Sequence, residues 1–445
     1  MDRLERCVAD AIIGIDTLWG GDVLNPSGTG RFIADSWFSD EPLPLAYTHE
    51  AAGSLRASGG VASKQLDRAA VDAYLAAVDV RGAIAGMGDG GRALGGSRGA
   101  YLEGLATCFE AMWELVQELL GRGAPVPYER CVRASTGAAP EPSDPRAKRD
   151  RVAALVAKAG YDGDVLTAAD AWRRDRMVPT KSIPSLGEAF IAHFDALTAR
   201  NVMPHLPEPL GRVPRANIRF LPIENAWFSG SMNYLGRART AQGRPEYEAT
   251  YEINAALQIS VPEFQQLVSH EVVPGHVTTF AFLQDLFVRG QVGFEASVLT
   301  MNTRCAALFE GIANNAILMA HGVKSVEELP DEDLQVGVLL ALLQDDAKNQ
   351  SSYLTWKEGW PREEVAGVLR KEYLCSEERS DKLSGAWGRH PLLGRMYLPA
   401  YRAGTERVAE LRRRHEASAV LPALFGCKGL VDVVTIAGAV PGGVG

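Results

Sequence analysis

The chain has 445 residues, of which 46% are apolar and 23% are charged, as expected for a globular protein with one large core or two domains. The net charge of −9 argues against nucleic acid as a partner, and no apolar run is long enough to span a bilayer, so no membrane partner is expected. Six cysteines are scattered without a close pair, and the start lacks the basic and apolar regions of a signal peptide. We therefore expect a cytoplasmic protein with reduced thiols.

The first half of the chain is predicted to be mainly helical. Apolar residues recur at helical spacing over residues 4–18 and, most clearly, over residues 102–120. Between them, the glycine-rich segment 82–99 carries Gly86-Met-Gly-Asp-Gly-Gly91. A phosphate-binding loop needs a buried strand before it, and the preceding residues are alanine-rich and helical in pattern. The glycines therefore predict a flexible loop and not a phosphate site.

The sequence changes in character after the proline-rich residues 204–215, which are the best candidate for a domain boundary. We divide the chain there into a helical N-terminal region, 1–210, and a second region, 211–445. The second region opens with short β-branched and aromatic runs that predict strands over 217–223, 226–229 and 247–253. Beyond residue 262 the pattern is almost entirely helical.

A helix is predicted to begin after Ser260, because Ser260 and Glu263 match a capping box and Pro262 suits the first helical turn. At the far end of this helix, His270 and Glu271 stand side by side. An imidazole can bind a metal ion, and an adjacent carboxylate can take a proton from a water on that metal. The pair is therefore a candidate metal ligand and general base.

The next histidine, His276, lies six residues beyond His270. Six residues of an ideal helix leave two side chains about 120° apart, so the two imidazoles converge only if the helix breaks. Pro274 and Gly275 are well suited to break it. The alternative is a proline-kinked core helix with two incidental histidines. Because the whole chain has only eight histidines, we favour the metal site.

The stretch His-Glu-x-x-Pro-Gly-His resembles the signature of the bacterial domain-of-unknown-function 885 family, zincin-like proteins proposed to be metallopeptidases. The resemblance covers about residues 215 to 415. It implies a mainly α fold (α+β), in which a zincin-like helical metalloprotein carries a small β-sheet beside the metal helix. In such peptidases the sheet borders the cleft.

A third metal ligand is implied on a later helix, where Glu310-Gly-Ile-Ala313 is similar to the family's Glu-Gly-Trp-Ala motif. The apolar neighbours of Glu310 favour this role over that of a solvated glutamate, since an isolated buried charge is costly. Catalytic zinc usually takes three protein ligands. His270, His276 and Glu310 together therefore predict one Zn²⁺ per chain.

The segment Tyr401-x-x-Gly404 resembles the family's late Tyr-x-x-Gly motif, which implies that Tyr401 donates a hydrogen bond to the transition-state oxyanion. Tyr397, His390 and Arg395 are alternative donors. A buried tyrosine on a helix also commonly serves packing alone, and this interpretation stays open.

One helix face departs from the family pattern. Where the family carries Arg, Asp and His at four-residue spacing, the matching positions here are Lys348, Ser352 and Trp356. The loss of a carboxylate and an imidazole suggests an altered substrate or reaction type. Trp356 is expected to add an apolar wall to the cleft.

These features predict a zinc-dependent hydrolase that cleaves a peptide or amide bond in a small substrate, with Glu271 as the base and Tyr401 as the oxyanion donor. One alternative is a metal-dependent small-molecule amidase or lyase of specialised metabolism. Another is a non-catalytic helical binding protein with a vestigial site. The N-terminal region is expected to cover the metal, so that the cleft admits small molecules and short peptides but not folded proteins.

Overall fold

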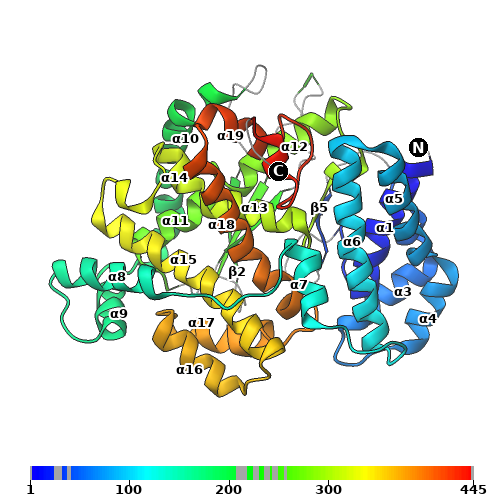
Figure 1. Ribbon diagram of the computed structural model, residues 1–445, viewed down its shortest axis with the longest axis horizontal. Coiled ribbons are helices and arrows are strands. Elements are labelled where there is room, and N and C mark those ends of the chain that lie inside the picture. Colours follow the sequence, from blue (N-terminus) through cyan, green and yellow to red (C-terminus); the bar gives the residue numbers. More distant parts are fainter. Residues whose placement is uncertain are drawn as a thin grey trace.

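The computed structural model describes residues 3–24, 33–37, 42–206, 218–223, 230–234, 241–242, 249–254 and 258–441. The protein is mainly α-helical, as the sequence predicts (Figure 1). The helices up to residue 201 are α1 (Arg3–Trp19), α2 (Leu45–Thr48), α3 (Glu50–Ser58), α4 (Arg68–Ala77), α5 (Val80–Leu94), α6 (Gly96–Leu119), α7 (Tyr128–Thr136), α8 (Arg146–Lys158), α9 (Val165–Asp175) and α10 (Ile183–Asn201). The later helices are α11 (Val261–Glu271), α12 (His276–Val288), α13 (Arg304–Asn314), α14 (Ala316–His321), α15 (Glu332–Ser352), α16 (Arg362–Glu372), α17 (Glu377–Lys382), α18 (Leu398–Arg414), α19 (Ala417–Leu424) and α20 (Ile436–Ala439).

The glycine-rich segment 82–99 lies within α5 and the start of α6, which are separated at Gly95 alone, so the prediction of a flexible loop is wrong. Asp79 caps α5 by accepting a hydrogen bond from the backbone N–H of Gly82. α5 lies against α1 and α6, and a Cβ at Gly91 would come within 2.9 Å of the Gly99 carbonyl oxygen. The glycines therefore serve close helix packing, which offsets their low helix propensity.

The strands form two small sheets. In one, β2 (Ile218–Ile223) pairs parallel with β4 (Ala249–Asn254), which pairs antiparallel with β3 (Gly230–Tyr234). In the other, β1 (Ala34–Trp37) pairs antiparallel with β5 (Val298–Thr300). β3 lies against α11 and α12. The predicted strand 226–229 falls outside the described residues, and the sequence pattern does not anticipate β3.

Most helices of the first 206 residues lie in two groups on opposite sides of the molecule in Figure 1. α1 and α3–α6 are on the right, α8 and α9 are at the far left, and α15 and α18 run between them. One continuous hydrophobic cluster includes Ile12 of α1, Phe109 of α6, Phe264 of α11 and Leu340 of α15. Most of the predicted boundary at 204–215 lies outside the described residues.

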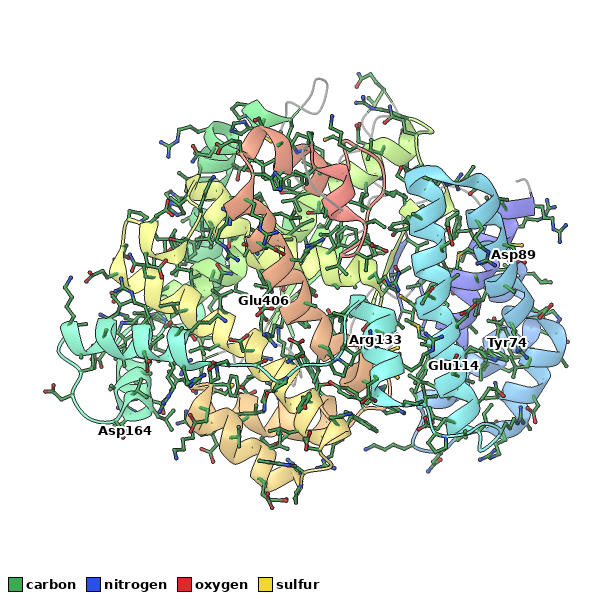
Figure 2. The ribbon with its side chains drawn as sticks, viewed as in Figure 1. Tyr74, Asp89, Glu114, Arg133, Asp164 and Glu406 are labelled. Carbon is green, nitrogen blue, oxygen red and sulfur yellow. The ribbon has the colours of Figure 1, made fainter. Side chains whose placement is uncertain are left out.

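Buried polar contacts fix the arrangement at the right-hand end. Tyr74 is fully buried, and its hydroxyl donates a hydrogen bond to the Ala46 carbonyl, which ties α4 to α2 (Figure 2). Arg98 of α6 forms ion pairs with Glu5 of α1 and with the buried Glu295, whose Oε1 lies 2.7 Å from the guanidinium Nε. These pairs join the N-terminal helices to the segment that follows α12.

Candidate metal centre

The helix that carries the first histidine starts where the sequence predicts. The side chain of Ser260 accepts a hydrogen bond from the Glu263 backbone N–H and donates one of 2.7 Å to Glu263 Oε2. This contact satisfies a backbone donor of the first turn of α11, as in a capping box. Phe264 and Val268 then face the core.

The predicted break at Pro274-Gly275 is confirmed. α11 ends at Glu271, the Val273–Pro274 peptide is cis, and α12 begins at His276. The Gly275 N–H donates to the Ser269 carbonyl at 3.1 Å, and a Cβ at Gly275 would lie 1.8 Å from the His270 carbonyl oxygen. Only glycine permits this fold-back, which leaves the rings of His270 and His276 nearly perpendicular with centroids 4.7 Å apart.

Helix α13 brings Glu310 to the same place. Glu310 Oε2 lies 3.4 Å from His270 Nε2 and 3.8 Å from His276 Nε2. One ligand atom from each of the three residues lies within 4.8 Å of the other two. Ligands of a tetrahedral zinc ion, with bonds of about 2.0–2.1 Å, stand roughly 3.3 Å from one another. The three side chains therefore converge near that spacing, close enough for one ion to bring them together.

The charges at this cluster also suit a cation. Glu310 is only 5% exposed, and its Oε2 has no hydrogen-bond partner among the described residues. Burial opposes ionisation of Glu310, but the adjacent imidazoles of His270 and His276 hold its pKa at about 2. Burial lowers the pKa of His276 to about 4, so this imidazole is neutral at pH 7. A buried carboxylate oxygen without a donor beside a neutral imidazole is a donor set that fits zinc.

Helices α13 and α18 approach closely enough to place tyrosines on this cluster. Gly311 and Gly404 form the contact, since a Cβ at Gly311 would lie 2.3 Å from the Gly404 carbonyl oxygen. Tyr397, which ends the π-helical turn Leu393–Tyr397 before α18, donates a 2.7 Å hydrogen bond to Glu310 Oε1. The hydroxyl of Tyr401 donates to that of Tyr397 at 3.0 Å. The glycines of the two motifs that carry the family resemblance are thus in contact with each other.

The other two candidate donors are engaged away from the cluster. His390 Nδ1 accepts hydrogen bonds from the backbone N–H groups of Leu392 and Leu393. Arg395 forms a two-pronged ion pair with Glu118 of α6, with both N–O distances at 3.0 Å. Neither residue lines the cavity described next.

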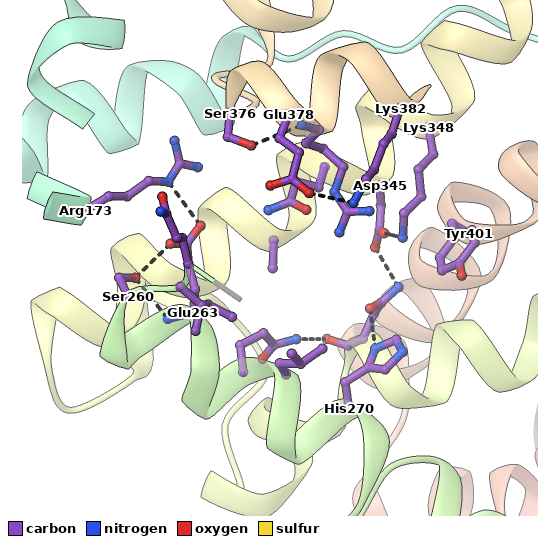
Figure 3. Close-up of a pocket in the computed structure, with 18 of the residues that line it drawn as sticks. Arg173, Ser260, Glu263, His270, Asp345, Lys348, Ser376, Glu378, Lys382 and Tyr401 are labelled. Atoms are coloured by element: carbon purple, nitrogen blue, oxygen red, sulfur yellow. Dashed lines mark hydrogen bonds and ion pairs between the residues drawn. The ribbon is translucent and has the colours of Figure 1, made fainter. Parts of the chain in front are cut away.

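A cavity of about 230 Å³ opens beside the histidines. Figure 3 shows His270 on one side of it, Lys348 and Tyr401 on a second, and Arg173 with Glu263 on a third. Glu271 also lines the cavity, whereas His276 and Glu310 do not. The wall is highly charged and largely paired into salt bridges, which are Arg173–Glu263, Lys348–Asp345 and Lys382–Glu378. The site is therefore a polar chamber next to the donor set.

The prediction that Trp356 forms an apolar wall is wrong. α15 ends at Ser352, and residues Tyr353–Lys357 form a π-helical turn, which changes the four-residue spacing on which the prediction rests. Trp356 donates a 2.6 Å hydrogen bond to the Gly388 carbonyl and does not line the cavity. Ser352 likewise bonds elsewhere, to the Gly394 carbonyl and the Tyr128 hydroxyl. Trp387, which the sequence does not single out, lines the cavity instead.

Of the three residues at which the sequence departs from the family pattern, Lys348, Ser352 and Trp356, only Lys348 lines the cavity. Its Nζ lies 2.9 Å from Asp345 and 3.2 Å from the centre of the Tyr401 ring. Sequence reasoning also missed Asn314 and Asp345. Asn314 Oδ1 lies 2.8 Å from His270 Nδ1, and its amide nitrogen lies 2.6 Å from Asp345 Oδ2.

Comparison with known proteins identifies the fold and nothing finer. No family profile matches the sequence, and no curated protein matches it. The structure is similar to that of a protein from Colwellia psychrerythraea described as a "putative lipoprotein", with a TM-score of 0.53 and 14% identity over 85% of this chain. A second, from Shewanella oneidensis and described as a "putative lipoprotein of unknown function", gives a TM-score of 0.47 at 14% identity over 86% of this chain. The matches span 63% and 66% of those two longer chains.

The sequence predicts reduced thiols and no membrane-spanning segment. All six cysteines are free. Among the described residues, no helix combines the length and the apolar character needed to cross a bilayer.

Proposed function

We propose that this protein is a zinc-dependent hydrolase of the zincin type, which cleaves a peptide or amide bond in a small substrate. The observation that carries the proposal is the convergence of His270, His276 and Glu310 next to a cavity that Glu271 also lines. The helix breaks between His270 and His276, and this break accommodates the longer spacing His-Glu-x-x-Pro-Gly-His on which the family resemblance rests. The zincin-like character of the fold and membership of that family are part of the same proposal.

Three side chains would hold the ion and leave a position open, as in catalytic zinc sites. A bound zinc ion would polarise a substrate carbonyl and lower the pKa of a water. His270, His276 and Glu310 supply the donor atoms, and the hydrogen bond from Tyr397 orients the Glu310 carboxylate.

The remaining groups act on the substrate. Glu271 follows His270 directly and would accept a proton from the attacking water, then deliver it to the leaving nitrogen. Tyr401 lines the cavity and has a hydroxyl pKa held well above its usual value, first by burial and then by the charge of Glu310. It therefore stays protonated, and its O–H, which donates to the Tyr397 hydroxyl in this structure, can turn to donate to a developing oxyanion.

The cavity favours small substrates. Its volume of about 230 Å³ is below the range of roughly 300–1,000 Å³ that is usual for small-molecule sites. Among the described residues before position 207, Arg173 and Met177 line it. Its paired charges suit a substrate with polar ends. Ser352 and Trp356, which suggested a different reaction type, form hydrogen bonds to backbone carbonyls away from the cavity, so no second function is favoured.

Metal content is the test of this proposal. We expect one zinc per chain in the wild type and a large loss of metal in His270→Ala and in His276→Ala. His193→Ala is the matched control, because His193 is exposed on α10 and does not belong to the cluster. Equal metal content in the wild type and all three variants would refute the proposed site.

Glu271→Gln tests the catalytic part separately. The substitution keeps the shape of the side chain and removes the base, so zinc should remain while turnover falls by about 10²–10⁴-fold. Turnover would be followed on a set of short peptides and simple amides, and zinc by elemental analysis of the same sample. Loss of the metal, or turnover at the wild-type rate, would contradict the role assigned to Glu271.

A further inference from the structure

We propose that Asn314 and Asp345 are positioning residues that hold the imidazole of His270 with its Nδ1 protonated and its Nε2 lone pair directed at the metal. This inference rests on the zinc site proposed above and extends it to the groups behind one ligand. It concerns an acid and an amide that line the cavity and would act on the metal through His270.

Asp345, Asn314 and His270 are joined by a chain of hydrogen bonds, which we call the relay. Asn314, the last residue of α13, is 7% exposed, and its side-chain oxygen lies 2.8 Å from His270 Nδ1. Its side-chain nitrogen has two acceptors, Asp345 Oδ2 at 2.6 Å and Thr405 Oγ1 at 2.8 Å. Every polar atom of the Asn314 side chain is therefore satisfied in one orientation of the amide.

Asp345 fixes that orientation. An ionised carboxylate can only accept hydrogen bonds, so it requires the NH₂ group of Asn314 to face it. Lys348, with its Nζ 2.9 Å from Asp345 Oδ1, stabilises the charge, and Thr405 donates to Asp345 Oδ2 at 3.4 Å. The oxygen of Asn314 must then face His270 and accept its Nδ1–H. A neutral imidazole with the proton on Nδ1 has its free lone pair on Nε2, the nitrogen that faces Glu310.

His276 shows what the relay adds. Its Nδ1 is buried without a hydrogen-bond partner among the described residues, and its ring is instead stacked on Phe280 with centroids 5.5 Å apart. The orientation of His276 therefore depends on packing, whereas that of His270 depends on a directed hydrogen bond. Partners of this kind behind a metal-bound histidine typically contribute 10–100-fold to metal affinity.

The direction of the relay can be reversed and restored by substitution. In Asp345→Asn, the new amide can offer either its oxygen or its NH₂ group to Asn314. Asn314 can then turn its own NH₂ group to His270, which moves the imidazole proton to Nε2 and blocks ligation. The double variant Asn314→Asp/Asp345→Asn restores one direction, because the carboxylate now next to His270 accepts from Nδ1–H and from the amide at position 345.

Asp346→Asn is the matched control. Asp346 is the adjacent residue of α15, is 3% exposed against 4% for Asp345, and pairs with Lys148 at 2.7 Å. It makes no contact with Asn314 or His270 that would set their direction. Its substitution removes the same chemical group from an equally buried, lysine-paired position, and so reports the effect on zinc affinity of losing a buried carboxylate that does not contact Asn314.

The experiment is a zinc titration of the purified full-length chains against a competing chelator, with circular dichroism to confirm folding. We expect Asp345→Asn to bind zinc about 10–100-fold more weakly than the wild type, the double variant to recover to within about threefold, and Asp346→Asn to match the wild type. Equal affinities for Asp345→Asn and Asp346→Asn, or a double variant as weak as Asp345→Asn, would overturn the relay and leave the zinc site standing. A wild type that binds no zinc would overturn both proposals.

Discussion

The fold-back at Gly275 gives the sharpest prediction, because it joins the two candidate histidine ligands. In Gly275→Ala, the added methyl group would lie 1.8 Å from the His270 carbonyl oxygen and 2.5 Å from that of Ser269. Both are backbone atoms, so no side-chain rotation relieves the clash. Real Cβ atoms essentially never lie closer than 3.0 Å to another non-bonded heavy atom. The backbone at Gly275 must therefore move away from the His270 carbonyl by at least about 1.2 Å.

That displacement is large compared with what a metal site tolerates. Zinc–ligand distances vary by about 0.2 Å, so a shift of more than 1 Å removes His270 or His276 from the coordination sphere. Overpacking of this kind also costs about 1–3 kcal/mol in the free energy of unfolding. We expect a folded but destabilised protein with zinc affinity reduced by at least about 100-fold.

Zinc affinity would be measured by titration against a competing chelator, and stability by urea unfolding. Both measurements would start from the metal-free protein. Gly367→Ala is the control, since Gly367 lies within α16 and a Cβ there meets no atom within 4 Å. This control should bind zinc normally and gain up to about 1 kcal/mol in stability, because alanine has the higher helix propensity. Wild-type zinc affinity in a folded Gly275→Ala would refute the reasoning.

Three further outcomes follow from contacts described above. Arg98→Met should lower the unfolding free energy by about 3 kcal/mol in urea titrations because it leaves the fully buried Glu295 unpaired, whereas Arg92→Met, whose ion pair is 60% and 74% exposed, should change it by less than about 1 kcal/mol. Tyr401→Phe should retain zinc and keep KM while kcat falls by about 10²-fold, and an unchanged kcat would show that the hydroxyl serves packing alone. Intact casein should not be cleaved, and efficient cleavage that is lost in Glu271→Gln would show that the cavity admits large substrates.

Local sequence signals were sufficient for the elements that build the site. The capping pair Ser260 and Glu263 predicted where α11 begins, and Pro274 with Gly275 predicted where it must break. Both signals act within one or two turns of backbone, where hydrogen bonding and steric clash decide the structure. The position of Glu310, some 34 residues beyond His276, required the family resemblance, because no local pattern reports which helices meet.

The predictions that were wrong or missing also concern structure that no local residue pattern reports. The glycines of α5 predict a loop when read alone, but they allow α5 to lie against α6, so tertiary packing overrides their propensity. Trp356 was placed by assuming an unbroken α-helix, and the π-helical turn at its position could not be read from the residue types. Asn314 and Asp345 went unnoticed because a buried polar side chain has no signature until its partners are known.

The contact between Gly311 and Gly404 limits which substitutions these two positions can accept during evolution. The two residues are 93 positions apart, and each already has the smallest possible side chain at a point where backbones touch. A larger residue at one position cannot be accommodated by a smaller residue at the other, so no compensating pair of substitutions exists. In an alignment of proteins that share this helix crossing, both columns should contain glycine alone. Methods that infer proximity from correlated substitutions would therefore find no signal at one of the closest approaches between α13 and α18.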